Sequence, residues 1–291
     1  FPDLVDSEMA TVSGLRWAES EPDLATGPSG TTQGLSIDGE IGTDHPERLG
    51  RYVVRSVLGS GGFGTVYRAY DEQLDREVAV KTSTRPAFEE TAEWKRLVTN
   101  ERFLREARRV ARLKHPGIVT VHDVGVDEGR RYIVSDLVDG VTLDVWRRSR
   151  EVSWREAVAM VMAVADALAY AHAARVVHRD VKPENVLVRP DGQPVLVDFG
   201  IAISEQDADE RRGEVLGSPG YMAPEQIVGK AYDIDGRTDI FSLGVVLYLL
   251  VCGKHPFAGG SSTRMVNAVL DRKSTRLNSS HSSVSRMPSS A

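Results

Sequence analysis

Two short stretches of the chain carry the residue types that phosphoryl transfer requires. The first, HRDVKPEN, runs from His178 to Asn185, and the second, DFG, begins at Asp198. Phosphoryl transfer is catalysed mainly by positioning and charge stabilisation. It needs a carboxylate to orient a hydroxyl, a cation near the moving group, and oxygen ligands for a metal ion. Asp180, Lys182, Asn185 and Asp198 supply these groups, so the spacing predicts a phosphoryl-transfer site.

A glycine-rich segment precedes these motifs. Gly59, Gly61, Gly64 and Val66 form the pattern GxGxxGxV. A dinucleotide-binding turn would need a helix at the third glycine, but residues 65–70 (TVYRAY) are β-branched and aromatic, which favours a second strand. We therefore expect a glycine hairpin whose backbone amides approach the phosphates of a nucleotide.

A strand and a helix are predicted between these two regions. Residues 77–81 (EVAVK) form a short apolar strand ending at Lys81, which could also be a solvated strand end. Residues 100–113 place apolar side chains at i, i+3 and i+4, as a helix does. Glu106 lies on that stripe, and Glu101 lies on a neighbouring turn.

These motifs, with GYMAPE at residues 220–225 and DIFSLG at 239–244, resemble those of a bacterial, eukaryotic-like (Hanks-type) serine/threonine protein kinase. The resemblance covers residues 51–270. It implies an α+β, two-lobed fold with a small antiparallel β lobe carrying one helix and a larger, mainly helical lobe. It also implies magnesium-dependent transfer of the γ-phosphoryl group of ATP to serine or threonine hydroxyls of a protein substrate. A nucleotide-binding pseudokinase or scaffold is the alternative, but every catalytic position has the required residue type.

The resemblance also assigns roles to individual residues. The expected catalytic residues are Asp180 as base, Lys182 as phosphate neutraliser, and Lys81 paired with Glu106 at the α and β phosphates. Asn185 and Asp198 are the expected Mg²⁺ ligands. The expected nucleotide-binding residues are the three glycines and Lys81, with Leu58, Val66, Ala79 and Leu187 around the adenine and the hinge backbone of Asp136 and Val138.

Composition agrees with an ordinary packed domain, which we expect to be cytoplasmic. Hydrophobic residues make up 41% of the chain and charged residues 27%, and no secretory signal or basic patch for nucleic acid is visible. The longest apolar stretch, residues 240–252, is too short to cross a bilayer and favours a core helix. The single cysteine, Cys252, is expected to be buried in that helix.

The two ends of the chain differ from the middle. Residues 1–50 hold ten acidic residues against two arginines, and we expect a disordered acidic leader. Residues 271–291 are serine-rich and resemble a translated sequencing adapter, so we expect a disordered, non-native tail. The predicted organisation is thus a leader, an N-lobe with hinge at 51–139, a C-lobe at 140–270 that is truncated, and the tail. Such a fragment would have little activity.

The segment between DFG and APE bears on activation. Residues 201–222 contain no threonine but several acidic residues. Arg179, beside the expected base, needs an anion, which a phosphothreonine supplies in many relatives of the resembled family. One hypothesis is that Glu210 or a neighbour serves as a fixed anion. A solvated acidic loop explains the composition equally well.

Overall fold

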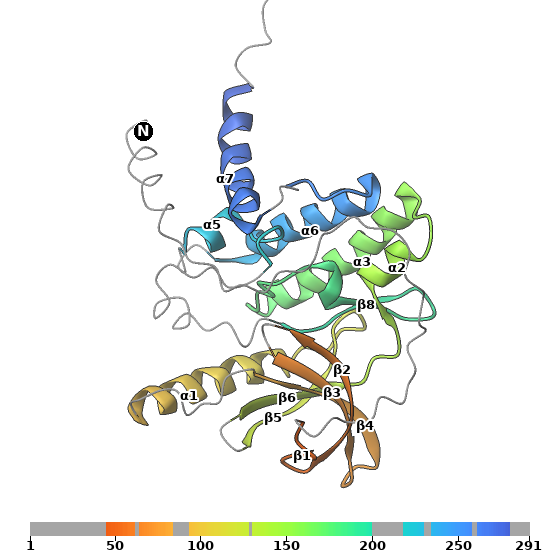
Figure 1. Cartoon of the computed structure of the whole chain (residues 1–291), viewed down its shortest axis with the longest axis vertical. Coiled ribbons are helices and arrows are strands. Elements are labelled where there is room, and N and C mark those ends of the chain that lie inside the picture. The colour runs from red at the N-terminus through yellow and green to blue at the C-terminus, as the bar shows by residue number, and fades with distance from the viewer. Residues whose placement is uncertain are drawn as a thin grey trace, which may run out of the picture.

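The computed structural model describes residues 45–61, 64–83, 93–127, 130–199, 218–229, 234–257 and 261–279, with only the backbone of residues 93–100, 102 and 272–279. The described strands of the N-terminal part form one sheet. Most of the helices belong to the C-terminal part, which lies next to that sheet (Figure 1). This is the predicted two-lobed α+β arrangement.

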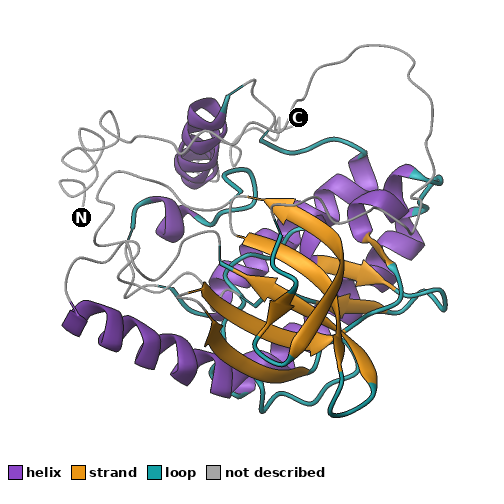
Figure 2. Ribbon diagram, turned by 60° about the horizontal axis from the view of Figure 1, so that its bottom comes forward, coloured by secondary structure: helices purple, strands orange, loops and turns teal. Residues whose placement is uncertain are grey.

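The N-lobe sheet has six antiparallel strands in the order β1-β2-β3-β4-β6-β5. Their bounds are β1 Arg48–Leu49, β2 Tyr52–Gly61, β3 Gly64–Asp71, β4 Arg76–Thr82, β5 Val121–Asp127 and β6 Arg130–Asp136. The predicted hairpin is present, since Gly59 pairs with Val66 and Gly61 with Gly64. Figure 2 shows how strongly the sheet twists, as right-handed strands require.

Alternation along β4 gives the sheet two different faces. Val78 and Val80 are fully buried in an apolar cluster with Tyr52, Tyr67 and Val134. Ala79 and Lys81 lie on the opposite face, because successive side chains of a strand point to opposite sides. The predicted strand therefore turns its lysine away from the outer core and toward the C-lobe.

Helix α1, Glu93–Val110, is the helix predicted at residues 100–113, and it begins earlier than expected. Its side chains Phe103, Ala107 and Val110 are buried in the large core that also holds residues of the C-lobe. The i, i+4, i+7 spacing of these residues explains why one stripe of the helix is buried. Glu106 lies beside this stripe and is about one-third exposed.

The C-lobe combines helices with a small three-stranded sheet of order β7-β8-β9. Its elements are β7 Val141–Thr142, α2 Leu143–Arg148, α3 Trp154–Ala173, the 3-10 turn η3 Pro183–Asn185, β8 Val186–Val188, β9 Pro194–Leu196, α5 Pro224–Ile227, α6 Gly236–Cys252 and α7 Ser262–Ser279. The N-terminus of α3 is fixed by the capping box of Ser153 and Glu156, in which each residue accepts from the other's backbone N–H.

Helices α3 and α6 pack together at the centre of this lobe. Val164 and Leu168 of α3 share the core with Leu243, Val246 and Leu250 of α6. Among the described helices, α3 is long and apolar enough to cross a bilayer, yet it lies against α6 as a core helix does. The prediction of a core helix over residues 240–252 is confirmed.

Two expectations for the C-lobe were wrong in detail. Cys252 is exposed rather than buried, because it is the last residue of α6 and lies past the turn that buries Leu249 and Leu250. Residues 271–279 were expected to be disordered, but they continue helix α7. Val266 and Val269 of α7 pack against the α5 region, and a helix that is already nucleated extends at little cost. The disordered leader expected at residues 1–50 is also wrong at its end, because Arg48–Leu49 form strand β1, which pairs with β2, and Leu49 is buried in the core of the sheet. Residues 1–44 and 280–291 lie outside the described residues.

Candidate active site

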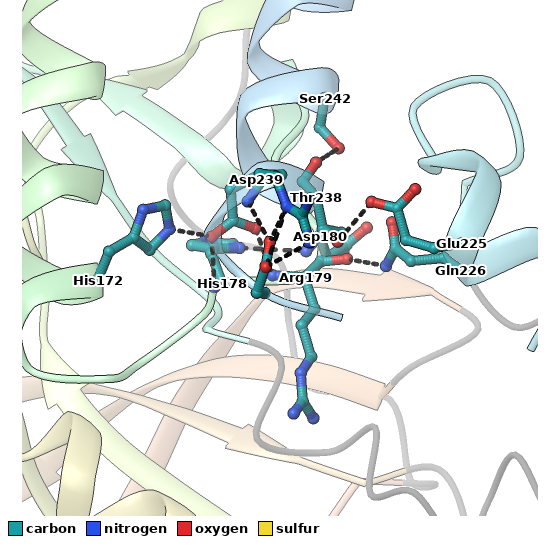
Figure 3. A network of polar contacts seen from close by, with 11 residues as sticks. His172, His178, Arg179, Asp180, Glu225, Gln226, Thr238, Asp239 and Ser242 are labelled. Carbon is teal, nitrogen blue, oxygen red and sulfur yellow. Dashed lines mark hydrogen bonds and ion pairs between the residues drawn. The ribbon is translucent and has the colours of Figure 1, made fainter. Parts of the chain in front are cut away.

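The segment that carries the expected catalytic base is anchored by a buried aspartate of α6. The Asp239 carboxylate accepts hydrogen bonds from the backbone N–H of His178 and of Arg179, both at 2.8 Å, and contacts Nε2 of His172 at 2.7 Å (Figure 3). Asp239 is completely buried. Arg179 has a positive φ of 67°, a backbone conformation that residues other than glycine rarely adopt. The two backbone bonds to Asp239 hold it there.

His178 connects this segment to the DFG segment. Its Nε2 lies 3.0 Å from the Val197 carbonyl oxygen, and its Nδ1 accepts from the N–H of Asp180 at 3.3 Å. A nitrogen facing a carbonyl must donate and one facing an N–H must accept, so the imidazole is neutral with its proton on Nε2. The ring also packs on Phe199, with centroids 4.5 Å apart. The tertiary structure thus brings HRD and DFG side by side.

Asp180, Lys182 and Asn185 form one polar cluster. Lys182 Nζ lies 2.9 Å from Oδ2 of Asp180 and donates to Oγ of Ser218 at 3.0 Å. The Asn185 amide donates to both the side chain and the carbonyl of Asp180 at 2.8 Å. Pro183 begins the turn η3, which places Asn185 back over Asp180. Both donors contact Oδ2 of Asp180, and no hydrogen bond or ion pair from the described residues reaches its Oδ1.

Lys81 and Glu106 lie on the N-lobe side of the same region. Lys81 Nζ is 3.0 Å from Oδ2 of Asp198, whose φ is 60°. Glu106 Oε1 lies 3.8 Å from Nη1 of Arg179. Lys81 therefore forms an ion pair with the DFG aspartate, and Glu106 lies near Arg179 of the HRD motif. The expected pairing of Lys81 with Glu106 stays a prediction.

The expected adenine-binding residues lie around the β2–β3 hairpin, β4 and β8. Ala79 is opposite Ser135 in the pairing of β4 with β6, and Asp136 ends β6 at the hinge. Leu58 is half exposed, whereas Val66, Ala79 and Leu187 are partly buried. Val138 follows in the hinge and is also partly buried. Their role in holding a nucleotide stays a prediction.

The glycines of the hairpin differ in what surrounds them. A Cβ on Gly64, where φ is 139°, would lie 1.8 Å from the Thr82 carbonyl oxygen, so this position requires glycine for packing. A Cβ on Gly59 or Gly61 would meet no described heavy atom within 4 Å. Packing among the described residues therefore gives no reason for these two glycines, and close approach of a ligand to the backbone would give one.

The donor set at Asn185 and Asp198 fits a magnesium ion. Asn185 uses its amide nitrogen on Asp180, which leaves its amide oxygen for a ligand role. Asp198 offers a partly exposed carboxylate, and Val197 donates to the carbonyl of Asn185 at 3.0 Å, which keeps the two segments adjacent. Mg²⁺ prefers oxygen ligands and commonly binds one or two protein groups plus phosphates and waters.

Several residues that shape this site had no assigned role in the sequence. Gln226 donates to the Arg179 carbonyl and Thr238 donates to Glu225, at 2.8 and 2.9 Å. His172 and Asp239 complete the network in Figure 3. The sequence drew attention to Asp239 only through its place in the DIFSLG motif. No sequence motif indicated a role for His172. The acidic residues proposed as a fixed anion, Glu210 included, lie outside the described residues.

A further ionisable group, Tyr221, lies in the segment that begins at Ser218. Burial, and then the negative charge of Glu184, raise the pKa of the Tyr221 phenol far above its ordinary value. Tyr221 therefore stays neutral. Its backbone carbonyl accepts from Ser242 of α6 at 2.7 Å, which fixes the segment that begins at Ser218.

Fold and site together define a two-lobed phosphotransferase, and comparison with known proteins gives its family. The model of the protein kinase domain matches residues 52–290. The chain belongs to the protein kinase family, which confirms the resemblance, the fold and the class of enzyme. The family generally uses ATP and Mg²⁺. The match continues past Leu270, where the sequence analysis ended the C-lobe.

The relatives include bacterial serine/threonine-protein kinases. PknA of Mycobacterium tuberculosis (strain H37Rv) is 44% identical over 217 residues, covering 72% of this chain and 48% of PknA. PknL of the same strain is 39% identical over 224 residues, covering 76% and 54%. A probable serine/threonine-protein kinase of Streptomyces coelicolor is 38% identical over 232 residues, covering 75% and 32%. The chain spans about half the length of PknA and PknL and about a third of the Streptomyces protein.

Proposed function

We propose that the full-length protein transfers the γ-phosphoryl group of ATP to serine or threonine hydroxyls of a protein substrate. The observation that carries this proposal is the cluster in which Lys182 lies between Asp180 and Ser218, at 2.9 and 3.0 Å. It places an anchored carboxylate next to a cation, and an acceptor hydroxyl needs both as its oxygen attacks phosphorus.

Each side chain then has a separate task. Asp180 orients the acceptor hydroxyl and takes up its proton, while Asn185 donates one hydrogen bond to the Asp180 carboxylate and one to its backbone carbonyl. Lys182 stabilises charge on the transferring group. Lys81 binds phosphate oxygens from the N-lobe, and Asn185 and Asp198 would hold Mg²⁺. The metal, when bound, neutralises the phosphates.

The backbone geometry supports this assignment. Positive φ values at Arg179 and Asp198 mark two strained residues on either side of the cluster. Strain of this kind persists where the surroundings over-determine it, and it concentrates at functional sites. Here Asp239 and Phe199 with His178 supply those surroundings. We further propose that the protein acts in the cytoplasm.

The decisive test replaces the base without changing its shape. The Asp180→Asn variant of the full-length protein should lose incorporation of labelled γ-phosphate into a generic protein acceptor. Titration with ATP should give an unchanged Kd, because no phosphate contact is removed. Asp191→Asn, at an exposed turn between β8 and β9, is the matched control and should keep full activity. Incorporation by Asp180→Asn at the wild-type rate would contradict the proposal.

A further inference from the structure

Strand β5 carries a β-bulge at His122, directly behind the hinge. Val121 pairs with Ser135 and Asp123 pairs with Val134, so His122 is the extra residue on β5. A bulge bends its strand and redirects the side chain of the inserted residue. The His122 side chain is directed at Asp136, with Nε2 2.6 Å from Oδ1.

The contact between these two side chains requires a proton. A nitrogen and a carboxylate oxygen at 2.6 Å would repel each other if both presented lone pairs, so Nε2–H donates to the Asp136 carboxylate. Arg76 Nη1 lies 3.2 Å from the same nitrogen. Because a guanidinium can only donate, it makes no hydrogen bond to a protonated Nε2, and Arg76 contributes only a positive charge near the carboxylate. The bulge thus builds a small polar cluster of Arg76, His122 and Asp136.

Asp136 is held by its backbone as well. Its N–H donates to the Thr120 carbonyl at 3.0 Å, so β5 and the residues before it bind both the N–H and the side chain. Ser135 is opposite Ala79 and shares the face of Ala79 and Lys81, because paired residues lie on the same side of a sheet. The Asp136 side chain therefore points away from that face.

The backbone carbonyl of Asp136 is the polar group that the hinge offers to a ligand. The hydroxyl of Ser135 reaches this carbonyl at 3.4 Å, a long contact that leaves the oxygen with capacity for a better donor. This carbonyl lies at the end of β6, in the hinge whose backbone is expected to bind the adenine. The carbonyl is attached to the Cα whose N–H and side chain are both held, so these two contacts restrict the carbonyl's position.

We propose that His122 is a positioning residue for the nucleotide: through its hydrogen bond to Asp136 it sets the hinge carbonyl that accepts from the purine amine. The inference rests on the proposed kinase function. The His122 side chain is 19% exposed and that of Asp136 is 47% exposed. A partly exposed ion pair contributes little to the free energy of unfolding. We therefore expect the His122–Asp136 contact to act mainly on the local geometry of the hinge.

The test compares two replacements of His122 in the full-length protein. His122→Phe keeps a ring but removes the donor, and should raise both the KM for ATP and the Kd of a fluorescent ATP analogue about fivefold, with kcat within about twofold. His122→Gln places an amide N–H near the position of Nε2 and should restore both values to within about twofold of wild type. The split between KM and kcat and the rescue by Gln separate positioning from a general loss of structure.

Two controls sharpen the result. His115→Phe removes a similar histidine–aspartate contact, at 3.1 Å to Asp166 of helix α3 rather than to the hinge, and should leave the KM for ATP unchanged. Asp136→Ala breaks the same bond from the other side. It should raise the KM to the same extent, and the double variant with His122→Phe should show no further increase.

The contrary outcomes are also distinct. An unchanged KM and Kd in His122→Phe, or a Gln variant no better than Phe, would overturn the role of His122 while the kinase function stands. If the wild type binds ATP normally but transfers no phosphoryl group, the kinase function is overturned. The role of His122 in nucleotide binding would then be judged from the Kd values alone. If the wild type binds no ATP, both proposals fail.

Discussion

Ser218 and Lys182 lie 36 positions apart in the sequence, and the Nζ of Lys182 donates to the Oγ of Ser218 at 3.0 Å. The hydroxyl holds the ammonium group beside Asp180 and links the catalytic segment to the segment that leads into α5. Tyr221, three residues after Ser218, is in turn bonded through its carbonyl to Ser242 of α6. The position of Lys182 thus depends on residues from three separate parts of the C-lobe.

This contact predicts a loss of catalysis when the hydroxyl is removed. Ser218→Ala should lower kcat about tenfold, which corresponds to roughly 1.4 kcal/mol of lost transition-state stabilisation. The Kd for ATP should not change. Ser218→Thr keeps the hydroxyl and should retain most of the activity. Steady-state kinetics of the full-length protein would check this, and equal kcat values for the Ala and Thr variants would show that Ser218 does not position Lys182.

The hairpin glycines provide a matched pair of substitutions. Gly64→Ala should destabilise the N-lobe, because its Cβ would collide with the Thr82 carbonyl and φ is 139°. Gly59→Ala should leave the urea midpoint unchanged, because no described atom lies within 4 Å of its Cβ. It should nevertheless weaken ATP binding if phosphates approach this backbone. Tight ATP binding by Gly59→Ala would mean that the nucleotide does not contact that part of the hairpin.

Asp239 should be among the most sensitive positions for stability. Asp239→Ala leaves the buried N–H groups of His178 and Arg179 without their acceptor, and each unsatisfied donor costs about 1–3 kcal/mol. Urea unfolding should therefore show a loss of about 2–6 kcal/mol for the two donors together. Asp235→Ala, which removes the exposed N-cap of the same helix, should cost only about 1 kcal/mol. Similar losses for the two variants would argue against Asp239 as the anchor of the catalytic segment.

His255 predicts how stability changes with pH. Its ring packs edge-on against Tyr221, 5.0 Å between centroids, and burial lowers the pKa of its imidazole from 6.5. The unfolded chain therefore binds a proton at a higher pH than the folded one does, so His255 makes stability decrease as pH falls below about 6.5. Above that pH both states are neutral and His255 has no such effect.

The measurement compares His255→Phe with the wild type by urea unfolding at pH 7.5 and 5.5. The Phe variant should lose less stability on acidification, because it removes one group that must take up a proton on unfolding. The other titratable groups are the same in both proteins. The quantity compared is therefore the change in unfolding free energy between pH 7.5 and 5.5, wild type against variant. An identical loss in both proteins would show that His255 is as easily protonated in the folded state.

The residues expected to do chemistry were identifiable from the sequence, because the turn η3 and short strands place near neighbours together. Asp180, Lys182 and Asn185 lie within six residues, so the local backbone keeps them close together before any long-range contact orients their side chains. The glycine hairpin was predictable for the same reason, since the strand preference of residues 65–70 decides between a hairpin and a helix.

Tertiary structure decided the contacts that hold these residues. Asp239 meets His178 from 61 positions away, and only the packing of α6 on α3 determines that its carboxylate faces two backbone N–H groups. The pairing of His122 with Asp136 depends on a one-residue bulge, which no periodicity along β5 indicates. Residues 271–279 continue helix α7, whose Val266 and Val269 pack against the α5 region, and their own sequence did not indicate a helix. Residue types fix which chemistry is available, whereas burial and register decide which groups meet, because those depend on contacts between segments far apart in the chain.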